Sequence, residues 1–172
     1  LGVVIEIKYD TSRVILDFGA PFNPTNEIYD GVVLHRNKNR VKDAILLEKA
    51  VKLDYLYTRK DLQDLDLIES DNSNYKQAIF ISHLHLDHMS EVDKVDPNIP
   101  IYVHEDGLKL KKALEDINEE IYIRDLSAFK YHQEYIIGDI KVTPYFSDHC
   151  CIGAASFLIK CPDVTILYSG DI

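Results

Sequence analysis

The stretch His83-Leu84-His85-Leu86-Asp87-His88 places four metal-binding side chains within six residues. It directly follows an apolar run, residues 78–82, that has the composition of a buried strand. Imidazole and carboxylate groups are the ligands that zinc, manganese and iron prefer in proteins. Capping or surface roles for all four side chains explain this density less well. The stretch therefore predicts a divalent metal site at the end of a strand.

The spacing within the stretch indicates two neighbouring ions. In an extended chain, side chains two residues apart point to the same side, so His83 and His85 can bind one ion. Asp87 and His88 lie in a turn that leads into the following helix, where they can face a second ion.

Two residues at the ends of later predicted strands are candidates for completing the site. A metal site with an open coordination position needs about three protein ligands per ion. His149 follows a predicted strand at 142–146, and Asp171 follows another at 164–169. Taken alone, each residue has an equally good alternative, a structural histidine for His149 and a turn residue after Gly170 for Asp171.

Composition restricts the class of protein. A chain of 172 residues that is 46% apolar is typical of a single soluble domain with a sizeable core. A net charge of −10 argues against bulk attraction to nucleic acid or anionic lipid, although bound dications would offset it locally. The basic cluster at 36–42 is read as a solvated loop in preference to a substrate contact.

Cysteine usage and hydropathy favour a cytoplasmic protein without a membrane partner. The three cysteines, two of them adjacent, do not form a disulfide framework. No apolar run is long enough to span a bilayer, and the amino end lacks a secretion signal. Because the chain starts at Leu1 and stops just after a predicted strand, we expect a piece of a longer protein.

Apolar periodicity predicts a layered α/β domain with two sheets in one fold. A β-hairpin is expected over 3–9 and 13–18, and a crossover unit over 78–123. Helices are expected at 41–55, 59–68, 89–95 and 105–117, and further strands at 78–82, 100–104, 121–123, 134–137, 139–146, 154–160 and 164–169.

Four motifs resemble those of the metallo-β-lactamase fold superfamily, in the order in which the family has them. Residues 83–88 resemble its HxHxDH signature, and Tyr145-Phe146-Ser147-Asp148-His149, followed by Gly153-Ala154-Ala155-Ser156, resembles its third-histidine motif. Tyr168-Ser169-Gly170-Asp171 resembles the bridging-aspartate motif, and Ile15-Leu16-Asp17-Phe18-Gly19 the early aspartate motif. The resemblance spans nearly the whole chain and implies a partial αββα sandwich with an incomplete second sheet.

The resemblance also implies a ligand set. His83, His85 and His149 would bind one ion, Asp87 and His88 a second, and Asp171 would bridge both. The two ions would be zinc or manganese. The family supplies one more histidine to the second ion from beyond the aspartate, so residues 1–172 would be the N-terminal portion of the domain, with an incomplete second site.

Other polar residues receive supporting roles. Ser82 and Asp148 are expected to orient ligating histidines through hydrogen bonds. Asp17 either does the same or forms a turn at a strand end. Three histidines lie outside the family's ligand positions and are read as surface or structural residues: His35, His104 and His132.

Within the superfamily, the intervals from His88 to His149 and from His149 to Asp171 are similar to those of the β-CASP nucleases, notably the ribonuclease J group. This likeness implies that a nucleic-acid-clamping insertion and the last histidine follow residue 172. Lactamases that use a cysteine ligand fit poorly, because Asp171 occupies the bridging position and Cys150 is only adjacent to His149.

The expected function is hydrolysis of a phosphodiester, most readily in RNA, by a hydroxide that two metal ions activate. Asp87 and His88 would act at the second ion, with Asp87 also accepting a proton. Two alternatives stay open: a hydrolase of a small ester, thioester or lactone, and a catalytically silent assembly module. A homodimer also stays open.

Overall fold

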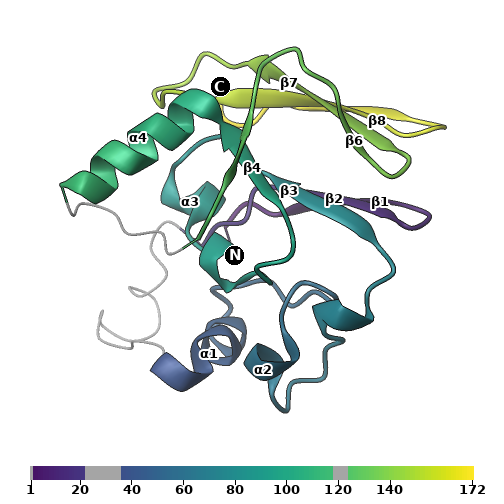
Figure 1. Cartoon of the computed structure of the whole chain (residues 1–172), viewed down its shortest axis with the longest axis vertical. Helices are drawn as coiled ribbons and strands as arrows, with labels where there is room; N and C mark the ends of the chain where they lie inside the picture. The colour runs from purple at the N-terminus through teal and green to yellow at the C-terminus, as the bar shows by residue number, and fades with distance from the viewer. Residues whose placement is uncertain (1, 22–35, 118–123) are drawn as a thin grey trace.

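A computed structural model describes residues 2–21, 36–117 and 124–172 of the chain. Among these residues, helices and strands are interspersed as far as α4, whereas only strands follow α4 (Figure 1). The elements are β1 (Ile5–Tyr9), β2 (Ser12–Leu16), the 3₁₀ turn η1 (Asn37–Asn39), α1 (Arg40–Leu46), α2 (Arg59–Leu62), η2 (Ser70–Asn72), β3 (Lys76–Phe80), α3 (Leu86–Met89), η3 (Val92–Lys94), β4 (Ile101–His104), α4 (Glu105–Asp116), β5 (Ser127–Phe129), β6 (Tyr135–Ile137), β7 (Ile140–Phe146), β8 (Ala155–Lys160) and β9 (Thr165–Tyr168).

The first sheet has the strand order β1-β2-β3-β4-β5. Strands β1 and β2 form an antiparallel hairpin, and β2, β3, β4 and β5 run parallel to one another. Parallel strands present their carboxyl ends at one edge of a sheet, where ligand sites of α/β folds commonly lie. Asp17 follows β2 and His83 follows β3, so both lie at this edge.

The second sheet, β6-β7-β8-β9, is antiparallel throughout and stacks on the first sheet (Figure 1). Alternate residues of each strand face the space between the sheets, as the two-residue period of a strand requires. Leu16 and Phe80 of the first sheet meet Phe157 and Ile159 of the second in one buried cluster. Hydrogen bonds join the sheets at the ends of β2 and β3, where Tyr168 of β9 bonds to Asp17 and Ala155 of β8 bonds to Ser82.

Helices cover the opposite face of the first sheet (Figure 1). Ile15 and Ile79, which alternate with the residues that face the second sheet, pack there against Val41 of α1, Leu62 of α2 and Met89 of α3. The layers are thus helices, sheet and sheet. None of the helices in the described ranges has the length and apolarity that crossing a bilayer requires.

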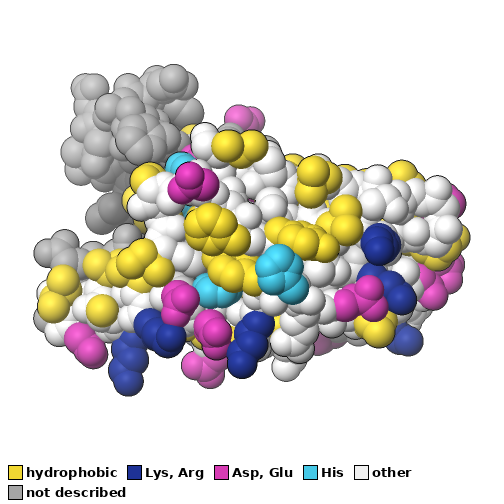
Figure 2. Space-filling view, turned by 90° about the horizontal axis from the view of Figure 1, so that it is seen from above, with side chains coloured by type: hydrophobic (Ala, Val, Ile, Leu, Met, Phe, Trp, Pro, Cys, Tyr) yellow, Lys and Arg dark blue, Asp and Glu magenta, His cyan; other side chains and the backbone are white. Residues whose placement is uncertain are grey.

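The outer face of the second sheet carries exposed apolar side chains (Figure 2). The strand register pairs Leu158 with Leu167. Both lie on this face, because the residues on either side of Leu158, Phe157 and Ile159, belong to the core between the sheets. Leu167 is 69% exposed.

Most of the strands and helix α4 confirm the pattern in the sequence, whereas the early helices are shorter than predicted. Helix α1 ends at Leu46, and Glu48 has a left-handed φ of 56°. Helix α2 ends at Leu62 because Gln63 has a φ of 53°. A left-handed residue cannot continue a right-handed helix. The predicted strand at 121–123 lies outside the described residues, and β5 was not predicted.

The basic cluster at 36–42 is partly helical, so the prediction of a solvated loop is wrong for η1 and the start of α1. Three of its cations form ion pairs with nearby carboxylates: Arg36 with Asp43, Arg40 with Asp93 and Lys42 with Asp64.

Candidate metal centre

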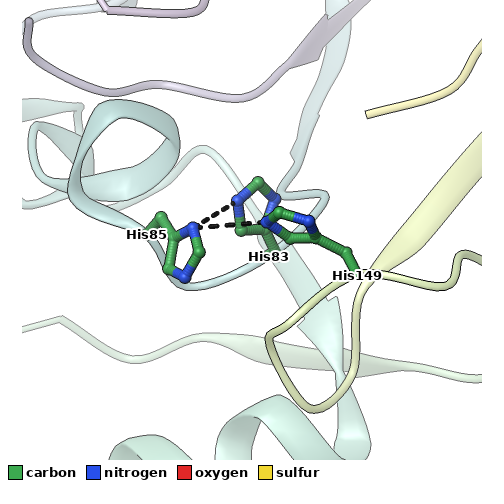
Figure 3. Close-up of side chains that lie close together, drawn as sticks. All are labelled: His83, His85 and His149. Carbon is green, nitrogen blue, oxygen red and sulfur yellow. Dashed lines mark hydrogen bonds between the residues drawn. The ribbon is translucent and has the colours of Figure 1, made fainter. Parts of the chain in front are cut away.

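Three histidines from two parts of the chain converge at the carboxyl edge of the first sheet (Figure 3). His83 follows β3, His85 begins α3, and His149 lies in the loop between β7 and β8. Nδ1 of His85 lies 3.0 Å from Nε2 of His83 and 3.4 Å from Nε2 of His149. A tetrahedral ion with Zn–N bonds of about 2.0–2.1 Å holds its nitrogen ligands roughly 3.3 Å apart. The donor set and its spacing therefore fit one divalent ion.

A second group shares His83 and adds His88 and Asp171, with ligand atoms within 4.8 Å of one another. Nε2 of His88 lies 3.4 Å from Oδ1 of Asp171 and 3.6 Å from Oδ2 of Asp87. Oδ2 of Asp171 lies 4.0 Å from Nε2 of His83 and 4.0 Å from Nε2 of His149. Asp171 thus lies between the two groups, and the fold brings together all six residues that the sequence singled out.

A network of buried hydrogen bonds around Asp17 lies directly behind these groups. The Asp17 side chain is fully buried, and its Oδ1 accepts a hydrogen bond of 2.6 Å from the backbone N–H of Ser82. Its Oδ2 is within 2.8 Å of Ser82 Oγ and of His88 Nδ1, and 2.6 Å from the Tyr168 hydroxyl. Asp17 also has a φ of 60°, so it both forms the turn after β2 and binds a candidate ligand.

This network determines which ring nitrogens face the site. An ionised carboxylate only accepts hydrogen bonds, so Nδ1 of His88 donates to Asp17 and leaves the lone pair of Nε2 toward Asp87 and Asp171. Ser82 gives its single hydroxyl proton to Asp17 and can then accept from Nδ1 of His83 at 3.0 Å. Nε2 of His83 is left with a free lone pair in the same way.

Burial and neighbouring charges shift the pKa values of the same groups. Burial, followed by the nearby rings of His88 and His85, lowers the pKa of His83 to about 4, which keeps this ring neutral near pH 7. Burial alone would lower the pKa of His88, but the hydrogen bond and charge of Asp17 outweigh it and raise that pKa. Burial and the Asp17 carboxylate raise the pKa of Tyr168, so its hydroxyl stays a donor.

The supporting residues match the sequence predictions only in part. Ser82 contacts His83 as expected, whereas Asp148 is exposed and has no hydrogen bond to a histidine within the described ranges. His104 caps α4 by accepting from the N–H of Asp106, and His132 is exposed, so both read as structural or surface residues. His35 lies outside the described residues.

Two residues at the site were not predicted to contact it. Tyr168 lies in the bridging-aspartate motif, but only the fold reveals its bond to Asp17. The Cys150 thiol lies 3.7 Å from Nε2 of His85 and 3.7 Å from Nε2 of His149, closer than adjacency in sequence alone indicated.

No family model matches the chain. Among solved structures, it is similar to a protein of unknown function from Enterococcus faecalis V583, with a TM-score of 0.81 and 26% identity over 99% of this chain and 40% of that one. A metallo-β-lactamase from Cronobacter sakazakii with a HARLDQ motif gives a TM-score of 0.58 and 11% identity over 98% of this chain and 52% of that one.

The metallo-β-lactamase fold protein YhfI from Bacillus subtilis gives a TM-score of 0.53 and 16% identity, over 99% of this chain and 55% of that one. This chain therefore spans about half the length of these solved proteins, or less. The two stacked sheets, the histidines at their shared edge and these likenesses agree: the chain has the metallo-β-lactamase fold.

Proposed function

We propose that the protein is a metal-dependent hydrolase with a two-ion centre. In this proposal, His83, His85 and His149 would hold one dication, Asp87 and His88 would hold the second, and Asp171 would contribute to both. The observation that carries the proposal is the position of the Asp171 carboxylate, whose oxygens lie 3.4 Å from His88 and 4.0 Å from both His83 and His149. A carboxylate that lies between two clusters of imidazole and carboxylate donors is suited to two adjacent cations.

The chemistry follows from this arrangement. Two dications lower the pKa of a coordinated water and stabilise negative charge on a substrate oxygen. The buried rings of His83 and His88 supply directed lone pairs because Ser82 and Asp17 hold their other nitrogens. The Asp87 side chain is 34% exposed, so it can reach both the centre and solvent and accept a proton there.

For the substrate, we propose a phosphodiester, and RNA in particular. Support comes from the motif intervals, which are similar to those of the β-CASP nucleases, and from the length of the Enterococcus faecalis protein. The match covers 40% of that protein but 52% of the Cronobacter enzyme, so the former has more chain for an inserted substrate-clamping domain. The second ion's last histidine would come from outside residues 1–172.

One observation favours a second candidate, a hydrolase of a small ester, thioester or lactone. The segments that carry the six candidate ligands, residues 82–90, 145–156 and 168–172, contain no Lys or Arg. They do present exposed apolar side chains at Leu86, Phe146 and Ile152. A rim of this kind suits an uncharged substrate better than a polyanion, unless cations from another part of the protein complete it.

The setting we propose is the cytoplasm. Neither Cys150 nor Cys161 forms a disulfide, which suits a reducing compartment.

The test compares the full-length wild-type protein with His85→Ala and Asp171→Ala. Each variant is assayed on labelled RNA, on a chromogenic phosphodiester, and on chromogenic ester and lactone substrates. We expect RNA and phosphodiester cleavage in the wild type and a loss of at least about a hundredfold in both variants, because each removes a ligand. His132→Ala, which replaces an exposed histidine away from the site, is the control.

Cleavage of the ester or lactone alone would favour the second candidate. Most of the activity surviving in both variants would refute the assignment of the site, and a metal-free, inactive wild type would favour an assembly module.

A further inference from the structure

Tyr168 connects the two sheets at the candidate metal centre. It lies in β9 of the second sheet, three residues before Asp171, and its hydroxyl donates a 2.6 Å hydrogen bond to Oδ2 of Asp17 at the end of β2. Its ring stacks nearly parallel to that of Phe157, with an interplanar angle of 8°, in the core between the sheets. Packing and hydrogen bond together fix the position of the hydroxyl.

The oxygen that Tyr168 contacts is the one that holds His88. Oδ2 of Asp17 also lies 2.8 Å from Nδ1 of His88, and both side chains are at most 1% exposed. A carboxylate rotates readily about its terminal torsion, so only its hydrogen bonds determine where Oδ2 points. The hydrogen bond from the Tyr168 hydroxyl reaches Oδ2 from the second sheet. Asp171 follows the same strand, β9.

We propose that Tyr168 is a positioning residue that sets the affinity of the second metal ion. By fixing Oδ2 of Asp17, it holds the His88 ring so that Nε2 faces Asp87 and Asp171. This inference rests on the proposed two-ion centre.

The effect is specific to the second ion because of how the first group is held. His85 and His149 have no hydrogen bond to Asp17 within the described ranges. His83 is linked to Asp17 through the Ser82 hydroxyl, which also bonds to Oδ2 at 2.8 Å. Ser82 keeps a second bond to Asp17, however, because its backbone N–H donates to the other oxygen, Oδ1, at 2.6 Å. Loss of the tyrosine hydroxyl therefore leaves the first group in place.

The experiment compares Tyr168→Phe with the wild type in the full-length, metal-free protein. Tyr145→Phe is the matched control, since Tyr145 lies in the same sheet, is 37% exposed, and has no hydroxyl hydrogen bond within the described ranges. Each protein is titrated with Co²⁺ in competition with a chelator, and the visible d–d absorption bands report the two binding steps separately.

We expect the first step to be unchanged in all three proteins. The second step should weaken by about tenfold or more in Tyr168→Phe, the range typical for partners that orient metal ligands, and stay at the wild-type value in Tyr145→Phe. Equal affinities in Tyr168→Phe and wild type would overturn the inference, as would a loss confined to the first step or shared equally by both.

Two further measurements distinguish failure of the Tyr168 role from failure of the two-ion centre and from misfolding of the variant. If wild-type protein binds fewer than two Co²⁺ ions, the two-ion centre itself is refuted, and the role of Tyr168 falls with it. If Tyr168→Phe does not fold, as judged by near-ultraviolet circular dichroism, Asp17→Asn decides. Its amide offers N–H groups to the Tyr168 and His88 donors, so the second step should again weaken, and an unchanged second step would overturn the inference.

Discussion

At the scale of single residues, Ser82 decides how the first group of histidines is presented. Its hydroxyl lies between Asp17 and His83, at 2.8 Å and 3.0 Å, and its side chain is 1% exposed. The hydroxyl thus links the buried Asp17 carboxylate to the ring of His83 and fixes the orientation of that ring. His83 belongs to both candidate ion sites. A group shared in this way is expected to affect both ions when it is lost.

Ser82→Ala should therefore weaken both Co²⁺ binding steps, each by about tenfold, because the ring of His83 loses the partner that holds its Nδ1. Chelator competition in the full-length protein measures the change. The control is Ser156→Ala in β8, since the Ser156 hydroxyl has no hydrogen bond to a candidate ligand within the described ranges, and this variant should bind as the wild type does. A Ser82→Ala protein with unaltered first-step affinity would contradict this role.

Arg13, unlike Ser82, has a structural role away from the candidate metal centre. It is buried near the start of β2, at the opposite end of the strand from Asp17. Its guanidinium donates to the backbone carbonyls of Asp54 and Tyr55 at 2.9 Å and 3.0 Å, and to the side chain of Glu6. Burial lowers its pKa, although the charge and hydrogen bond of Glu6 oppose that effect. Arg13 thereby anchors the irregular segment after α1 to the sheet.

Arg13→Met should reduce the free energy of unfolding by about 1–3 kcal/mol, since the buried carbonyls would lose their donor. Urea denaturation of metal-free protein measures this loss, with Lys8→Met, a more exposed neighbour, as the control. Because Arg13 is remote from the histidines, Co²⁺ affinity should stay unchanged. A large loss of metal binding in the folded variant would show that the assignment is wrong.

At the scale of elements, α3 carries Asp87 and His88 but is too short to be stable alone. Backbone hydrogen bonds from the chain before β1 and after β2 hold it: the N–H of Val3 donates to the carbonyl of Asp87 at 2.8 Å, and the N–H of Phe18 donates to that of His88 at 2.6 Å. Gly19 lies so close that a Cβ there would be 2.0 Å from the Asp87 carbonyl. Close backbone contact, rather than helix propensity, therefore positions these two candidate ligands.

Gly19→Ala should push α3 away from its position, reducing the free energy of unfolding by about 1–3 kcal/mol or more and weakening the second metal step. Gly107→Ala is the matched control. Gly107 lies in helix α4, and a Cβ there would be 3.8 Å from the nearest atom, in the Leu84 side chain, which is an ordinary contact. Its stability should hold or rise by at most about 1 kcal/mol. Wild-type stability and metal binding in Gly19→Ala would refute the account of α3.

The elements also show what the sequence could and could not predict. Strands such as β7 and β8 were predictable because alternating apolar residues mark a half-buried strand directly. The ends of α1 and α2 were not, because the left-handed conformations of Glu48 and Gln63 leave no mark in the apolar pattern. Residues 83–88 were recognisable as candidate ligands because their donor side chains are close together in the sequence.

Contacts between distant residues were beyond the sequence. The bond between Asp17 and Tyr168 joins residues 151 positions apart, and no period or motif encodes such a pairing. For the same reason Asp148 was expected to hold a histidine, whereas the buried Asp17 takes that place. The motifs thus gave the candidate ligands, and the packing of the two sheets gave the groups that orient them.

At the scale of the whole molecule, the candidate centre exists only where the two sheets meet. His83, His85, Asp87 and His88 belong to the first sheet's edge, whereas His149 and Asp171 follow strands of the second. The backbone N–H of Ala155 donates to the carbonyl of Ser82 at 2.8 Å and joins the sheets beside the histidines. The site is therefore a product of tertiary packing.

The central claim is a two-ion centre in which His83 takes part in both sites, and metal content tests it most directly. Full-length wild-type protein, His83→Ala and the control His132→Ala would be purified without chelator and their bound metal measured by inductively coupled plasma mass spectrometry. The account predicts two divalent ions per chain in the wild type and the control, and fewer than one in His83→Ala. A wild-type protein without bound metal, or two ions retained in His83→Ala, would contradict it.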